Sequence, residues 1–415
     1  MKQVKQTLKI ALFPFGLFYE GGGERLVFEQ MRGLEKKGNQ AVCFVPILIK
    51  DRCYPYWINK FKIKVFVPQW LNCFNSGMLL QMMVSSWLAP LQFWRFFKFD
   101  AFMGIGQPGV WIAFCLSKIL NKPYLAWMNQ PTRFLYPRKI DLENGLRISD
   151  KKSIASRTIK ILRPLVSVLD KASVCSADAL MCNSKLVANW LEKIYQKKVI
   201  QNYPGGELGA KIKKQGQKRF QGRLRIKGKM INKPFLLVTN RHFPQKKFEY
   251  SIRLMPFLRK KIPDLNLVIT GRENYHTRQL KTLIYQLDLE KKVIFTGFLE
   301  ERDLKKLYSQ AGVYLYVAPQ EDFGMGIVEA MFEKAPVVAW DEAGPKETVV
   351  NGRTGYLIKP YDLDDFGKKV LRLLTNKSLN KKMGQAGFKR AREKFTWQRH
   401  IDILEEKLRE LALLG

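Results

Sequence analysis

Histidine is scarce in this chain: only three occur among 415 residues. Because histidine is the commonest protein ligand for transition metals, a histidine-built metal site is not expected. The six cysteines show no C-x-x-C pair and no dense spacing, which predicts reduced, mostly buried thiols of a cytoplasmic protein rather than a disulfide framework. They are Cys43, Cys53, Cys73, Cys115, Cys175 and Cys182.

Long apolar runs are also missing. A membrane-spanning helix needs about 20 predominantly apolar residues, and the run at residues 78–91 is shorter and contains Gln81 and Pro90. The apolar run that begins at Ile10 follows several lysines, but it is short, is broken by Pro14 and lacks the small-residue cleavage site of a signal peptide. We therefore interpret it as a first β-strand and predict no transmembrane segment.

Acidic residues are few relative to basic ones: 36 Asp and Glu stand against 72 Lys and Arg, for a formal net charge of +36. Such a charge implies an anionic partner, either nucleic acid, an acidic membrane surface or a phosphorylated ligand. We interpret the strongly basic residues 211–233 as a solvated loop with a short helix, ahead of a phosphate or membrane contact. The chain length suggests two domains.

Aromatic and basic residues are interleaved between residues 52 and 102. Most aromatics in such a segment belong to a hydrophobic core, but Lys and Arg among Trp and Phe also suit a face that lies on a membrane surface. The residues concerned are Tyr54, Tyr56, Trp57, Lys60, Lys62, Trp87, Phe93, Trp94, Arg95, Phe96, Phe97 and Lys98.

The most informative stretch is residues 313–357. Val313-Tyr-Leu-Tyr-Val-Ala is typical of a buried strand, and Ile327–Lys334 of a helix, with Gly324–Gly326 as the turn between them. Glu321 then lies near the end of the strand, and Glu329 lies in the first turns of the helix. A helix that starts through glycines offers free N–H groups and a positive dipole end to an anion. A carboxylate at this place can accept hydrogen bonds from a diol such as a ribose.

Strands and helices alternate through the rest of the chain, which predicts parallel sheets. Residues 7–15 form an expected strand, followed by the glycines that include Gly22 and Gly23, a helix to about Lys37, and a stop at Gly38. The expected strand 123–128 ends at Asn129. The strand 235–239 leads to a basic loop that contains Arg241 and Lys246.

These motifs in this order resemble the family-4 retaining glycosyltransferases over nearly the whole chain. The residues that carry the resemblance are Glu321-x-Phe323-Gly324, Glu329, Gly344-Pro345-Lys346-Glu347 and Asn351-Gly352-x-x-Gly355. The resemblance implies an α/β protein of the GT-B fold, with two Rossmann-like domains whose parallel sheets face a central cleft. Residues 1–204 are expected to form the acceptor-binding domain, together with a crossover helix at 396–415. Residues 205–395 are expected to bind the nucleotide sugar.

The resemblance also implies roles for individual residues. Glu329 is expected to hold the ribose, and Gly324, Met325 and Gly326 to offer backbone N–H groups to the diphosphate and sugar. Arg241 and Lys246 are expected to neutralise the leaving diphosphate without a metal, since two cations can do so.

The remaining site residues follow from the same resemblance. Glu321 is expected to contact hydroxyls of the donor sugar, Gly22 and Gly23 to face the donor phosphates and the acceptor, and Gly297 to border the nucleotide base. Asn129 occupies a position at which the family carries a histidine. Catalytic roles are assigned to Glu321, Arg241, Lys246 and Asn129, and no cofactor is expected.

The sequence thus predicts a retaining enzyme that moves a hexose from a nucleoside-diphosphate sugar to a lipid-linked or cell-envelope glycan acceptor. The Pro131-x-Arg133 context favours mannose. The expected location is the inner face of the plasma membrane, on an anionic surface, with no specific nucleic acid as partner. Two alternatives stay open: a sugar-nucleotide epimerase of the same fold, which the shortage of histidine disfavours, and a basic nucleic-acid-binding protein, for which no zinc or RNA-binding signature is present.

Overall fold

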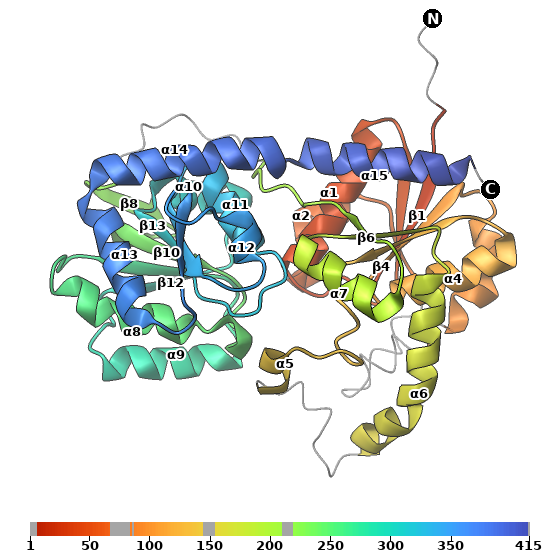
Figure 1. Ribbon diagram of the computed structural model, residues 1–415, viewed down its shortest axis with the longest axis horizontal. Helices are drawn as coiled ribbons and strands as arrows, with labels where there is room; N and C mark the ends of the chain where they lie inside the picture. The colour runs from red at the N-terminus through yellow and green to blue at the C-terminus, as the bar shows by residue number, and fades with distance from the viewer. Residues whose placement is uncertain (1–5, 67–83, 85–86, 144–153, 210–218, 414–415) are drawn as a thin grey trace, which may run out of the picture. The chain divides into compact units, whose positions relative to one another are not determined.

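The chain folds into two compact units, one made of Met1–Pro204 with Trp397–Gly415 and the other of Gly205–Thr396. The computed structural model describes residues 6–66, 84, 87–143, 154–209 and 219–413. Each unit is built on a parallel sheet with its own helices (Figure 1), so the expected α/β class with two parallel sheets is confirmed.

The sheet of the first unit has the strand order β3-β2-β1-β4-β5-β6-β7, and all its pairings are parallel. Its strands are β1 (Lys9–Pro14), β2 (Gln40–Val45), β3 (Ile63–Val65), β4 (Ala101–Ile105), β5 (Tyr124–Met128), β6 (Ala179–Cys182) and β7 (Ile200–Gln201). From β1 the strands are added on one side as β2 and β3, and the chain then crosses to the other side of β1, where it adds β4 to β7. This reversal makes the gap between β1 and β4 a topological switch point, where ligands bind in open parallel sheets.

Two helices of the first unit carry a clear start or stop signal. Ser184 caps α7 by accepting a hydrogen bond from the Val187 N–H at 3.2 Å, and Gly38 takes the positive φ of +86° that suits the stop predicted for α1. The helical segments are α1 (Gly22–Lys36), η1 (Lys50–Arg52), α2 (Pro55–Lys60), η3 (Pro90–Phe96), α4 (Gly109–Leu120), α5 (Lys139–Glu143), α6 (Ile154–Cys175), α7 (Lys185–Tyr195) and α15 (Trp397–Ala412).

The second unit repeats this plan with the strand order β12-β11-β10-β13-β14-β15, again all parallel. Its strands are β10 (Phe235–Thr239), β11 (Asn266–Thr270), β12 (Val293–Gly297), β13 (Val313–Tyr316), β14 (Val337–Trp340) and β15 (Gly355–Ile358). Its helical segments are η4 (Pro244–Lys246), α8 (Phe248–Arg259), α9 (Tyr275–Gln286), α10 (Glu301–Gln310), α11 (Met325–Phe332), α12 (Pro345–Thr348), α13 (Leu363–Thr375) and α14 (Lys377–Lys394). The switch point lies between β10 and β13.

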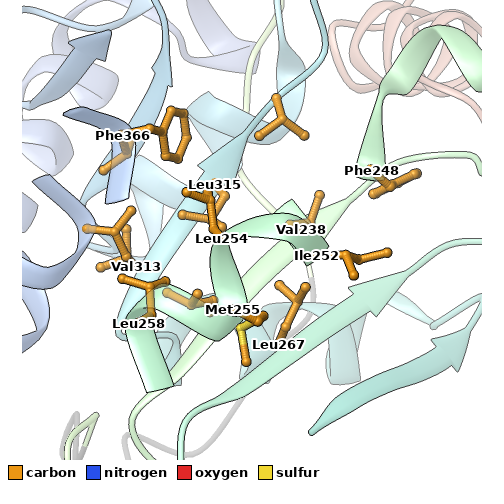
Figure 2. Close-up of a cluster of buried hydrophobic side chains, with 14 of the residues drawn as sticks. Val238, Phe248, Ile252, Leu254, Met255, Leu258, Leu267, Val313, Leu315 and Phe366 are labelled. Atoms are coloured by element: carbon orange, nitrogen blue, oxygen red, sulfur yellow. The ribbon is translucent and has the colours of Figure 1, made fainter. Parts of the chain in front are cut away.

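The core of this unit lies where α8 packs on the sheet. Figure 2 shows the buried side chains of the helix, among them Ile252 and Met255, beside Val238 of β10, Leu267 of β11 and Leu315 of β13. The strands bury nearly every side chain, as expected for a parallel sheet covered on both faces. The sheet is therefore a rigid base for the loops that leave its carboxyl edge.

The basic segment 211–233 departs from the expected loop with a short helix. Residues 210–218 lie outside the described part of the chain, but β8 (Arg223–Ile226) and β9 (Lys229–Asn232) form an antiparallel hairpin. Lys227 and Gly228 both take positive φ, which suits the tight turn of a two-residue hairpin. The hairpin buries Ile226 and Ile231. The sequence does not predict these strands, because only two buried isoleucines stand among many lysines and arginines.

No helix in the described ranges combines the length and the apolar character needed to cross a bilayer. Most of the apolar run at residues 78–91 falls outside those ranges.

Helix α15 is held in the first unit by α1 and by one buried imidazole. Lys37 Nζ donates to Glu405 at 2.9 Å, and a side chain at Gly33 would overlap Ile401. His400 is fully buried, with Nδ1 3.1 Å from the Tyr203 carbonyl oxygen and Nε2 3.2 Å from Nε2 of Gln30. The Nδ1–H tautomer satisfies both contacts. Burial lowers the pKa of His400 to about 4.

This burial predicts an acid-sensitive fold. The imidazole stays neutral in the folded chain, whereas the unfolded chain binds a proton below its ordinary pKa of about 6.5, so the free energy of unfolding falls as pH drops from there toward the folded pKa. The slope approaches 1.4 kcal/mol per pH unit, roughly. Urea unfolding at a series of pH values checks this. His400→Gln keeps an amide donor for Tyr203 and should lose less stability in acid than the parent; an identical pH dependence in both would contradict the assignment.

Candidate functional site

The carboxyl edge of the second sheet brings a cation and a carboxylate into contact. Lys246 lies at the end of η4, after β10, and Glu321 follows β13. These two strands flank the switch point, and Nζ of Lys246 forms a salt bridge with Oε2 of Glu321. Both side chains are partly exposed, so the pair remains accessible to a polar ligand. The structure therefore joins two of the predicted site residues at the place where a parallel sheet binds ligands.

The loop between β10 and η4 is anchored by a histidine to which the sequence assigned no role. His242 is fully buried, with Nδ1 3.0 Å from Oγ1 of Thr277 and Nε2 3.3 Å from the Thr270 carbonyl oxygen. Burial lowers its pKa, which favours the neutral imidazole. Arg241 precedes it and places its guanidinium 5.3 Å from the ring centre of Phe243. The loop that carries Arg241 is thus fixed to β11 and α9.

Glu329 lies at the end of a buried chain of hydroxyl groups. The Tyr308 hydroxyl donates to Oε2 of Glu329 at 2.7 Å, and the same hydroxyl is 2.7 Å from Oγ1 of Thr239, which is 2.8 Å from the Tyr314 hydroxyl. Burial, reinforced by the Glu329 carboxylate, holds the pKa of Tyr308 well above its ordinary value. Tyr308 is therefore a permanent donor that fixes one carboxylate oxygen. No periodic pattern in the sequence marks this network, because its tyrosines resemble ordinary core residues.

Helix α11 starts earlier than predicted, at Met325 instead of Ile327. Gly324 is the residue before it and has φ +87°, a left-handed conformation that favours glycine. Met325 and Gly326 are therefore the first two helical residues and not a turn, and N–H groups in a first turn have no partner within the helix. A β-carbon at Gly326 would overlap the Tyr314 hydroxyl and lie 3.0 Å from Oγ1 of Thr239. Glycine here lets the helix lie directly on the hydroxyl network.

Gly297 ends β12 at the same edge of this sheet. It takes φ +68°, and a β-carbon there would meet no atom within 4 Å.

In the first unit the structure brings Gly23 and Asn129 together. Gly22 and Gly23 are the first two residues of α1, not members of the preceding loop as predicted. Asn129 follows β5, and its Oδ1 accepts a hydrogen bond from the indole N–H of Trp127 at 2.9 Å. Its Nδ2 lies 4.0 Å from where a β-carbon of Gly23 would stand. Trp127 therefore sets the orientation of the amide, with the NH₂ group toward the start of α1.

Arg133 is engaged within its own unit. Its Nε donates to Oε1 of Gln130 at 2.9 Å and lies 3.5 Å from Oδ2 of Asp141, while its guanidinium stacks 5.3 Å from the ring centre of Trp190. These contacts give Arg133 a role in holding the loop that follows Asn129.

Comparison with known proteins places these features in a context. The family model described as "Glycosyl transferases group 1" matches residues 223–390, which include Arg241, Lys246, Glu321 and Glu329. The chain is 27% identical over 269 residues to the alpha-1,3/1,6-mannosyltransferase ALG2 of Mus musculus, a match that covers 61% of this chain and 63% of that protein. The Schizosaccharomyces pombe protein of the same name is 25% identical over 430 residues, covering 94% of this chain and 79% of its own length.

A solved structure shows the same fold over both units. The Anabaena protein Alr3699/HepE, in complex with UDP and glucose, superposes with a TM-score of 0.71 at 16% identity. The match covers 97% of this chain and 100% of that chain. This likeness confirms the GT-B fold expected from the sequence.

The close approach at Gly326 yields a stability test with a matched control. Gly326→Ala should lower the free energy of unfolding by about 1–3 kcal/mol, the usual cost of overpacking. Gly23→Ala changes the corresponding second residue of α1, where a β-carbon meets nothing nearer than 3.8 Å, and should be neutral or stabilising. Tyr314→Phe removes the overlapping oxygen and should restore most of the loss in the double variant. Equal effects of the two glycine substitutions on urea unfolding would refute the packing argument.

Proposed function

We propose a sugar, an acceptor and a setting for this chain, which belongs to the glycosyl transferases group 1 family and is a glycosyltransferase that uses a nucleotide sugar. The enzyme moves a hexose, with mannose favoured, from a nucleoside-diphosphate sugar to a lipid-linked or cell-envelope glycan acceptor at the cytoplasmic face of a membrane. The residues at the carboxyl edge of the second sheet bind the donor. The observation that carries the proposal is the convergence of Lys246, Glu321 and the start of α11 beside one switch point.

The donor diphosphate is the ligand that this edge suits best. Lys246 and the neighbouring Arg241 supply two cations, and the first turn of α11 supplies N–H groups and a positive dipole end. Charge on the diphosphate grows as the glycosidic bond breaks, so cations placed here stabilise the transition state more than the ground state. When the donor binds, the diphosphate competes with Glu321 for Lys246. Glu321 is then released to accept hydrogen bonds from hydroxyls of the sugar.

Glu329 is assigned to the ribose. Its Oε2 accepts a hydrogen bond from Tyr308, and a carboxylate has about four acceptor sites on its two oxygens, so it can also accept one from a ribose hydroxyl. Because Tyr308 holds the group in place, little side-chain entropy is lost when the nucleotide binds. Gly297, at the end of β12 with open space beside it, is assigned to the border of the base.

Asn129 is assigned to positioning and not to proton transfer. An amide donates and accepts hydrogen bonds but carries no proton at neutral pH, and Trp127 already occupies its oxygen. The NH₂ group is therefore the part that meets a sugar hydroxyl, near the glycines that open α1. We infer that asparagine supports catalysis where the family carries a histidine, because a positioning role needs only a fixed donor.

The names of two relatives and the charge of the chain support the proposed sugar and setting. Both ALG2 proteins are named alpha-1,3/1,6-mannosyltransferases, which supports mannose as the transferred hexose. The net charge of +36 supports an anionic surface as the setting of the reaction.

A donor screen tests this assignment. Purified protein incubated with UDP- and GDP-sugars should release nucleoside diphosphate fastest from GDP-mannose, with transfer when a membrane lipid extract is added.

Asn129→Ala should lower kcat by about tenfold, the worth of one hydrogen bond made in the transition state, with little change in donor KM. Lys139→Ala changes a side chain of the same unit that is 80% exposed and serves as the control. Tight nucleotide binding without turnover of any sugar would refute the enzyme assignment, and an Asn129→Ala enzyme as fast as the parent would refute the role of Asn129.

The hydroxyl network predicts a coupling between Tyr308 and Glu329. Tyr308→Phe should weaken binding of the nucleoside diphosphate by about 1–2 kcal/mol, because the carboxylate loses its fixed donor. In a Glu329→Gln background the same change should have little effect, since interacting residues are not additive. Calorimetric titration of the four proteins measures the cycle.

Tyr314→Phe is the matched control, because this buried hydroxyl belongs to the same network and is hydrogen-bonded to Thr239, whereas Tyr308 donates directly to Glu329. A 2′,3′-dideoxynucleotide should bind the parent and the Tyr308→Phe variant alike. If Tyr308→Phe weakens both nucleotides equally, Tyr308 supports the fold of the unit and does not position Glu329.

A further inference from the structure

The 3₁₀ segment η3 of the first unit is apolar on two opposite sides. Phe96 is fully buried in the core, where its ring lies 4.8 Å from that of Phe44. On the outer side Leu91, Trp94 and Phe97 are 64%, 59% and 58% exposed. Buried and exposed aromatics therefore alternate within one short element, and the exposed ones are not explained by the core.

The spacing of the exposed residues places them on one face. A 3₁₀ helix has three residues per turn, so Trp94 and Phe97 lie on the same side, and the exposed Leu91 precedes them, just before the kink at Gln92. The half-exposed Phe93 lies between them, with ring centres 5.7 Å from Trp94 and 5.8 Å from Phe97. The result is a compact apolar surface with a large indole at its centre.

Positive charge borders this surface. Helix α4 packs against η3, and Lys122, two residues after α4, donates from Nζ to the Phe97 carbonyl oxygen at 2.7 Å. Lys98 lies two residues after the end of η3, and Lys118 and Ile119 are exposed in the last turn of α4. We call Leu91, Trp94, Phe97, Lys98, Lys118 and Ile119 the η3 face.

Negative charge is almost absent from this part of the chain. Asp100 is the single acidic residue between Asp51 and Asp141, and its Oδ2 accepts a hydrogen bond from the Lys9 backbone N–H at 2.7 Å. That contact places the carboxylate at the start of β1. The η3 face therefore combines exposed Trp, Phe and Leu with lysines that have little local competition from carboxylates.

We propose that the η3 face docks on an anionic lipid surface. Exposed indole and phenyl rings beside lysines match the boundary between headgroups and acyl chains, where the rings enter the apolar layer and the ammonium groups pair with lipid phosphates. A protein partner would be expected to supply acidic residues and a defined pocket for Trp94, neither of which a lipid surface requires. The inference deepens the proposed function, because it assigns a membrane-docking surface to the unit expected to bind the acceptor.

Vesicle flotation of the full chain tests the proposal. The parent should bind phosphatidylcholine vesicles that contain phosphatidylglycerol, bind pure phosphatidylcholine poorly, and dissociate as salt screens the lysines. Trp94→Ser with Phe97→Ser should reduce binding to the anionic vesicles about tenfold or more, because two large apolar side chains no longer enter the interface. The matched control is Tyr275→Ser with Tyr285→Ser, which removes two rings that are 66% and 72% exposed on α9 of the other unit.

Charge is tested in the same way. Lys98→Glu with Lys118→Glu should weaken binding more than Lys260→Glu with Lys261→Glu, an exposed lysine pair in the second unit, although both double variants change the net charge equally. Calorimetry with the nucleoside diphosphate should give the parent Kd for all four double variants. Retained donor binding with lost vesicle binding separates this proposal from the assignment of the donor site.

Fluorescence quenching locates the contact without relying on a double variant. Brominated anionic lipid should quench the emission that the parent loses in Trp94→Phe. Vesicle binding that is unchanged in the aromatic variant, or reduced equally by the α9 control, would overturn the proposal. Absence of quenching at Trp94 would do the same, and so would capture of the η3 face by an oligonucleotide or a protein in place of lipid.

Discussion

The proposed donor site depends on how closely α11 approaches the hydroxyl groups of β10 and β13. Glycine at position 326 removes the side chain that would overlap the Tyr314 hydroxyl, and the helix can then seat Glu329 against Tyr308. Gly324 turns the chain with a positive φ just before the helix. The residues before that turn bring Glu321 to Lys246. This close approach thus aligns Glu329, which we propose for the ribose, with the Lys246–Glu321 pair, which we propose for the diphosphate and sugar.

Much of this site could be predicted from the sequence, and the reason is topological. In a parallel sheet the residues that follow each strand collect at one edge, so Arg241, Lys246, Gly297 and Glu321 could be placed together from strand positions alone. The family resemblance then supplied roles. The hydroxyl network could not be foreseen, because Tyr308 lies on a helix and Tyr314 in a strand, and both resemble core tyrosines until their hydroxyls are seen to meet. The anchoring role of His242 could not be predicted for the same reason, because its partners, Thr270 and Thr277, come from other elements.

Local errors have local causes. The sequence predicts that α11 starts two residues later than it does, and it predicts a loop at Gly22 and Gly23, because glycine ordinarily marks a turn. Here glycines occupy the first helical turns, where the backbone must approach another group or leave space for a ligand. The sequence does not predict the hairpin β8–β9, because lysines and arginines outnumber the two isoleucines that it buries. The basic composition of this segment predicts a loop, whereas the burial of two isoleucines stabilises a hairpin.

The net positive charge of the chain can be interpreted only when the basic residues are considered site by site. Two cations at the edge of the second sheet suit a leaving diphosphate, and they account for a small part of the net +36. The lysines of the η3 face have a different setting, beside exposed rings and far in sequence from the donor-binding residues. A phosphate ligand alone would explain the first group but not Trp94 and Phe97, since a diphosphate gains nothing from an exposed indole. A double-stranded nucleic acid would engage positive charge without requiring apolar side chains to leave water, and a single strand would stack bases on the rings but make no use of the aliphatic Leu91. An anionic lipid surface uses both charge and apolar contact, so the combination, and not the net charge, is what assigns the η3 face to a membrane.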